Sequence, residues 1–143
     1  MAREPITDKS LIDMMVERGA TYASTLWIHD AVHPHTRPNT MLVADAGVTM
    51  VLGSDSFCGR GQFGQNTLEE AELMEAAGLS PQQVLVAATS NAARHLERPD
   101  LGSVATGKRA DLILLRGDPT LSTSNLRKLS VTIQNGAVVV DKR

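Results

Sequence analysis

The sequence predicts an α/β protein with parallel strands, followed by a small β region near the C-terminus. Helix-like and strand-like segments alternate up to about residue 100, and such alternation joins parallel strands through helical crossovers. After Pro99 the pattern changes to short strand-like runs separated by turns. We therefore expect two regions, residues 1–100 and residues 101–143.

Three segments are expected at the N-terminal end. Thr7 can cap a helix over residues 11–18, which Gly19 ends. Residues 20–28 are a strand-length run that is rich in strand-forming residues. Residues 29–38 are polar and contain two prolines, so a loop is expected there.

A second strand is predicted over residues 48–53, after a short helix that begins at Asn39 or Thr40 and ends at Ala46. The strand is a short apolar run bounded by turn residues, which is typical of a buried parallel strand. The glycine-containing connection 54–65 then leaves its carboxyl end, where loops often carry function.

Two consecutive helices are expected over residues 67–77 and 80–96. Thr67 and Glu70 have the spacing of a capping box, in which each side chain binds the other's backbone N–H. The dipeptide Ser80-Pro81 provides an N-cap and a proline at the first helical position.

The C-terminal region is expected to contain four short strands. Residues 103–106 and 111–115 are predicted to flank a turn. Residues 131–134 and 137–140 are predicted to form a hairpin, because Asn135-Gly136 allows the positive φ angles of a type I′ turn.

Charge and cysteine content limit the possible partners and compartment. The net charge of −2 comes without a basic stripe, which argues against binding to nucleic acid or a membrane surface. The sequence contains no apolar run long enough to span a bilayer and no apolar signal region near Met1. With a single cysteine there is no internal disulfide, so a cytoplasmic location is expected.

Asp55 is the candidate catalytic residue, because it follows the predicted strand 48–53 directly. Side chains at the carboxyl ends of parallel strands often perform the chemistry of α/β proteins. Gly53-Ser54-Asp55-Ser56 is also ordinary turn and cap chemistry. Both interpretations stay open on this segment alone.

His29, His33 and His35, with Asp30 between them, form a second candidate site. Imidazoles and a carboxylate are metal-ligand types, but their spacing matches no standard zinc motif. Three interpretations stay open: a metal site, a loop that contacts substrate, and a solvated loop. Ser56 is counted with the three histidines as a candidate substrate contact.

Several motifs occur in an order that resembles the amidohydrolase superfamily. They are Gly53-Ser54-Asp55 and the segments 70–74, 77–81, 84–93, 102–112 and 131–140. The likeness is to the branch that contains imidazolonepropionases and Xaa-Pro and isoaspartyl dipeptidases, and it covers almost the whole chain.

The resemblance implies a (β/α)8 barrel that holds one or two divalent metal ions, with zinc as the expected metal, and a β-sandwich built from both chain termini. This chain would supply the last two βα units and part of the sandwich. Asp55 matches the aspartate after the eighth strand, which touches the metal and takes a proton from metal-bound water. The implied reaction is hydrolysis of carbon–nitrogen bonds other than peptide bonds in small amide, cyclic amide or dipeptide-like substrates.

The family's other metal ligands are absent from this sequence. They are histidines after the first, fifth and sixth strands and a lysine or glutamate after the fourth. A zinc site uses about three protein ligands, and two strands do not close an eight-stranded barrel. We therefore expect a fragment that is inactive alone and associates with itself or with a complementary chain. The alternative is a noncatalytic, oligomerising α/β module.

Overall fold

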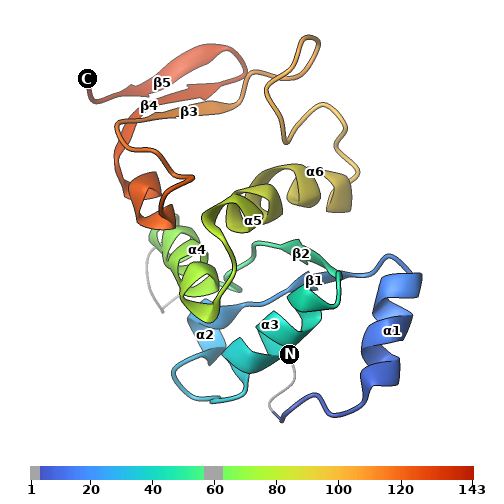
Figure 1. Ribbon diagram of the computed structural model, residues 1–143. Helices are drawn as coiled ribbons and strands as arrows, with labels where there is room; N and C mark the ends of the chain where they lie inside the picture. The colour runs from blue at the N-terminus through green and yellow to red at the C-terminus, as the bar shows by residue number, and fades with distance from the viewer. Residues whose placement is uncertain (1–3, 57–62) are drawn as a thin grey trace.

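The computed structural model describes residues 4–56 and 63–143 and contains two separate sheets (Figure 1). In the first sheet, β1 (Thr21–Ala23) pairs in parallel with β2 (Thr49–Val51). The predicted parallel strands are therefore confirmed. The central part of the connection 54–65, residues 57–62, lies outside the described residues.

Helices surround the parallel pair and supply most of the core. They are α1 (Lys9–Glu17), α2 (Leu26–His29), α3 (Thr36–Asp45), α4 (Gln65–Ala77), α5 (Pro81–Val86), the π-helical turn η1 (Ala87–Asn91) and α6 (Ala92–His95). Leu26, Val43, Met74 and Val84 are fully buried between them. The Asn91 side chain of η1 donates a 2.9 Å hydrogen bond to the Met50 carbonyl, so this helix is fixed against β2.

Two predictions for residues 20–38 are wrong in part. The run 20–28 leaves the extended conformation after Ala23, and its second half forms α2. The loop predicted over 29–38 ends at Thr36, where α3 begins, so Pro38 lies in the first turn of a helix. Proline is tolerated there because the first N–H groups of a helix have no partner within it.

Two of the predicted helix caps also differ. Asp8 rather than Thr7 caps α1, since its carboxylate accepts a 2.9 Å bond from the Ser10 N–H. The Thr67–Glu70 capping box does not form, because α4 begins earlier, at Gln65, and Glu70 is fully buried. By contrast, the predicted cap at Ser80 is confirmed.

The second sheet is antiparallel, with the strand order β3 (Leu112–Leu115), β4 (Leu129–Gln134) and β5 (Ala137–Asp141). The predicted hairpin is confirmed, with φ of 50° at Asn135 and 81° at Gly136. The predicted strand over 103–106 is wrong. Val104 is 85% exposed and the next residues turn, so this run has no buried face to stabilise a strand.

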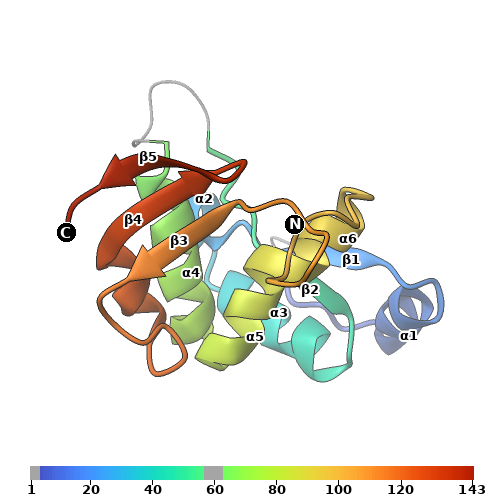
Figure 2. The same cartoon turned by 90° about the horizontal axis from the view of Figure 1, so that it is seen from above.

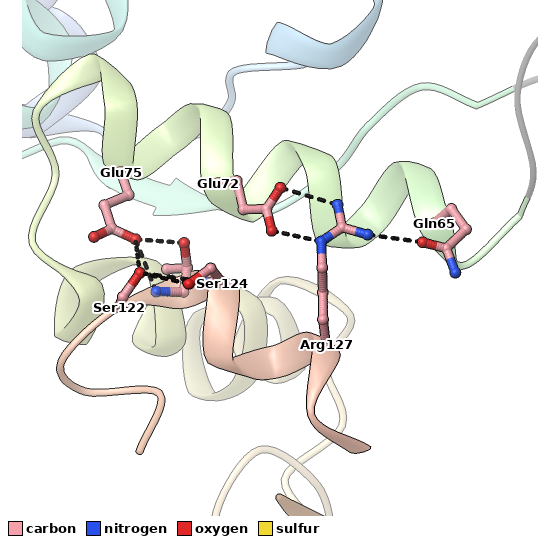
Figure 3. A network of polar contacts seen from close by, with 7 residues as sticks. Gln65, Glu72, Glu75, Ser122, Ser124 and Arg127 are labelled. Atoms are coloured by element: carbon pink, nitrogen blue, oxygen red, sulfur yellow. Dashed lines mark hydrogen bonds and ion pairs between the residues drawn. The ribbon is translucent and has the colours of Figure 1, made fainter. Parts of the chain in front are cut away.

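The helix η2 (Thr123–Arg127) joins the second sheet to α4. In Figure 1 this short orange helix lies between the antiparallel sheet and α4, and Figure 2 shows the sheet beside α4 from above. Arg127 forms an ion pair with Glu72 and also donates a hydrogen bond to Gln65 (Figure 3). The Glu75 carboxylate accepts a hydrogen bond from the backbone N–H of Thr123. The division near residue 100 stays a prediction. None of the helices in the described ranges is long and apolar enough to cross a membrane.

Candidate functional site

The carboxyl ends of β1 and β2 lie side by side at one edge of the parallel pair. Ala23 is the register partner of Val51, so the chain leaves both strands at the same edge. Ser24 follows β1 there, and Ser54 and Asp55 follow β2. The structure thus brings the candidate Asp55 to the edge at which parallel α/β sheets carry their chemistry.

Asp55 is exposed, whereas its two neighbours are held in place by hydrogen bonds. The hydroxyl oxygens of Ser54 and Ser56 are 2.7 Å apart, and the Asn66 side chain donates a 3.0 Å bond to the Ser56 hydroxyl. Asp55 accepts no hydrogen bond from any residue in the described ranges. Its carboxylate is therefore open to a ligand on a turn that other side chains fix. Ser56 helps to hold this turn, and its contact with a substrate stays a prediction.

Backbone strain marks the same edge. Asp55 has a φ of 53° and Thr25, two residues beyond β1, has a φ of 47°. Positive φ is uncommon for residues other than glycine, and for a β-branched residue such as threonine it is strained. Strained residues of this kind cluster at active sites and ligand clamps.

The histidine segment has its own internal contacts. The rings of His29 and His33 lie 5.6 Å apart between centroids, with a 36° tilt. The Arg37 guanidinium donates hydrogen bonds to both oxygens of the Asp30 carboxylate, at 2.8 and 2.6 Å. This pairing raises the pKa of Arg37. His35 stands directly before α3 without capping it through its side chain.

These positions do not form a metal centre by themselves. Among the residues that the structure describes, no group of three histidine, cysteine, aspartate or glutamate side chains could hold a metal ion. Asp30 is occupied by Arg37, and Asp55 is a single carboxylate. The donor set present therefore does not fit the zinc site that the family resemblance implies.

Sequence reasoning placed Glu70 in a capping box and missed its role as a fully buried carboxylate beside this edge. It accepts hydrogen bonds from the Ser24 hydroxyl and from the backbone N–H groups of Leu26 and Trp27. Burial raises the pKa of Glu70, and the three donors oppose that rise. A signal was present, because Glu70 lies one helical turn before Met74 and so shares its buried face.

The whole chain, apart from a few residues at each end, matches a known family model. Residues 6–141 match the model described as the amidohydrolase family. The chain belongs to the amidohydrolase family. The predicted superfamily membership is therefore confirmed.

Curated relatives of this amidohydrolase chain are longer proteins. An imidazolonepropionase from Salinispora tropica is 30% identical over 110 residues, which are 77% of this chain and 28% of the relative. Adenine deaminase 2 from Rhizobium etli is 52% identical over 46 residues, which are 32% of this chain and 8% of the relative. The chain thus spans less than a third of either protein.

Solved structures of hydrolases also superpose on this chain over part of their length. A Xaa-Pro dipeptidase with bound methionine in its active site superposes with a TM-score of 0.81 at 25% identity, over 92% of this chain and 37% of that one. Phenylurea hydrolase B gives a TM-score of 0.73 at 26% identity, over 97% and 37%. The α/β fold of this chain is therefore that of one part of such enzymes.

Proposed function

We propose that this chain supplies Asp55 and the last two βα units to the barrel of a metal-dependent amidohydrolase. The observation that carries the proposal is the position of Asp55, which is exposed and adopts a positive φ at the carboxyl end of a parallel strand pair. The family match and the short span of the chain within its relatives support it. The rest of the barrel and its metal ligands come from other segments or from a complementary chain.

In this role, Asp55 accepts a proton from the attacking water and delivers it to the leaving nitrogen. A carboxylate suits both steps, since it is ionised at neutral pH and reversibly protonated within hydrogen-bond reach. A divalent metal, zinc by family likeness, supplies an acidified water when bound. The described residues include no group of three side chains that could hold a metal ion, and we expect the isolated chain to be inactive.

The substrate class is a small amide, cyclic amide or dipeptide-like molecule. Its support comes from the names of the relatives, an imidazolonepropionase and a Xaa-Pro dipeptidase among them. His29, His33 and His35 follow β1 and are the candidates for contact with the substrate. The proposed location is the cytoplasm.

A noncatalytic, oligomerising module is the second candidate, and exposed apolar side chains favour it. Val138 and Val139 on β5 are 57% and 53% exposed, and Leu11 and Met14 on α1 are each 45% exposed. Apolar surfaces of this kind often mark contacts between chains. This candidate predicts association without any hydrolytic activity.

A chimera separates the two candidates. Residues 6–141 replace the matching segment of the Salinispora tropica imidazolonepropionase, and imidazolonepropionase activity and bound zinc are measured. The proposed function predicts an active, zinc-containing chimera and an inactive isolated chain. A chimera that folds with the parent's circular dichroism and stays inactive would support the noncatalytic module instead.

A further inference from the structure

We propose that Glu70 is a positioning residue that fixes the segment 24–27 at the carboxyl end of β1. The inference rests on the proposed function, because this segment borders the edge that Asp55 marks. Glu70 reaches it from α4, more than forty residues along the chain. The segment in turn leads into α2 and to His29, so its conformation sets where the candidate substrate contacts stand.

Three hydrogen bonds join the Glu70 carboxylate to this segment. Its Oε1 atom accepts from the Ser24 hydroxyl at 2.7 Å and from the Leu26 N–H at 3.0 Å. Its Oε2 atom accepts from the Trp27 N–H at 2.6 Å. Glu70, Ser24 and Leu26 are fully buried, so water does not replace any of these donors easily.

The position calls for a side chain that accepts three hydrogen bonds. Leu26 and Trp27 open the four-residue helix α2, and N–H groups in a first turn have no partner within the helix. The Thr25 side chain does not cap α2, so Glu70 performs this role from another element. A glutamine would turn an NH₂ donor toward one of three donors, which leaves buried groups unpaired.

The same bonds hold strained backbone in place. Thr25, with its φ of 47°, lies between residues that Glu70 binds on both sides. A helix as short as α2 does not form on its own, because nucleation fixes several residues for one hydrogen bond. Without Glu70, the segment relaxes to the extended conformation that its sequence favours.

Trp27 gives a direct readout of this segment. It is the only tryptophan in the chain, and its indole N–H donates a 2.6 Å bond to Glu69, the residue before Glu70. Its fluorescence therefore reports whether residues 24–27 keep their place against α4. A loss of global stability alone does not move this signal while the protein remains folded.

The first experiment uses the isolated chain and three variants. Glu70→Gln removes the acceptor pattern, Ser24→Ala removes one donor, and Glu72→Gln is the control on the same helix. Glu72 binds Arg127 rather than the segment 24–27. Emission and acrylamide quenching are measured at pH 7 in variants whose far-ultraviolet circular dichroism matches the parent.

Glu70→Gln should shift the Trp27 emission to longer wavelength and raise the quenching constant, and Ser24→Ala should do the same to a smaller degree. Glu72→Gln should change neither. If Glu70→Gln does not fold, Ser24→Ala against the control decides the question. An emission and a quenching constant like the parent's in folded Glu70→Gln or, failing that, in Ser24→Ala would overturn the inference.

The second experiment places the same variants in the active chimera. Glu70→Gln should raise KM more than it lowers kcat, because it moves a substrate-bordering segment and leaves Asp55 intact. An unchanged KM would show that the fixed segment does not serve the site. An inactive parent chimera would refute the proposed function instead, while the Trp27 measurement would still decide what Glu70 fixes.

Discussion

The Glu75 carboxylate of α4 accepts a 2.7 Å hydrogen bond from the backbone N–H of Thr123 in η2, and the Thr123 hydroxyl binds the same oxygen. The two residues are 48 positions apart. These bonds therefore fasten η2 to α4, the helix that also contains Glu70 (Figure 3). Because Thr123 is 1% exposed, the joint is partly shielded from water.

Replacing Glu75, which binds η2 to α4, should make the free energy of unfolding less sensitive to acid. The bonds from the Thr123 hydroxyl and N–H hold the pKa of Glu75 below its ordinary value of 4.5. Their stabilisation is present above pH 4.5 and is lost as the pH falls through the lowered pKa. Glu75→Gln should lower the free energy of unfolding by about 1 kcal/mol at pH 7 and flatten its decline below pH 4.5.

Urea unfolding between pH 3 and pH 7 measures this effect, with Glu17→Gln on exposed α1 as the control. Equal acid dependence in the parent and in Glu75→Gln would contradict it.

The pKa values of Glu70 and Glu75 should be shifted in opposite directions although the two residues share one helix. Desolvation raises the pKa of Glu70, while hydrogen bonds lower that of Glu75. The Glu70 contribution accordingly has the other sign: stability falls as the pH rises from 4.5 through its raised pKa. A carbon-13 NMR titration of the side-chain carboxyls should place Glu70 above and Glu75 below the ordinary value. The reverse order would show that the buried network is arranged differently.

Gly102 should be far less tolerant of alanine than Gly107, although both have a φ of 83°. A Cβ at Gly102 would meet the Ala93 Cβ at 2.6 Å and backbone atoms of Ser90 and Thr89 at 2.9 Å. Nothing lies within 4 Å of the same atom at Gly107. Gly107→Ala should cost about 1 kcal/mol through its backbone alone, and Gly102→Ala about 2–4 kcal/mol. Thermal and urea unfolding of the two variants check this; equal losses would contradict the close packing at Gly102.

Asp55 should matter little for stability. Its side chain is exposed, and asparagine tolerates a φ of 53° nearly as well as aspartate does. Asp55→Asn should therefore change the free energy of unfolding by less than about 0.5 kcal/mol. Asp55→Val should lower it by about 1–2 kcal/mol, because a β-branched residue disfavours this backbone. A large loss in Asp55→Asn would indicate that the residue is kept for folding.

Local sequence signals predicted the elements that local forces stabilise. The Asn135-Gly136 turn and the Ser80 cap depend on residues that are close in sequence. The second parallel strand was predicted from its short apolar run. The sequence did not predict α2, because the first turn of this helix is capped by Glu70, which lies more than forty residues later in the sequence. The position of Asp55 at the strand end was predictable, whereas the Glu70 network that fixes the adjoining segment depends on tertiary contacts.

The most direct test of the account is the turnover of the chimera with Asp55→Asn, relative to the parent chimera and to Asp45→Asn at the exposed end of α3. The account predicts that Asp55→Asn lowers kcat by about 100-fold or more, as loss of a proton-transfer group does, while the protein stays folded. The Asp45→Asn control should match the parent. A folded Asp55→Asn chimera with turnover within about twofold of the parent would contradict the role given to Asp55.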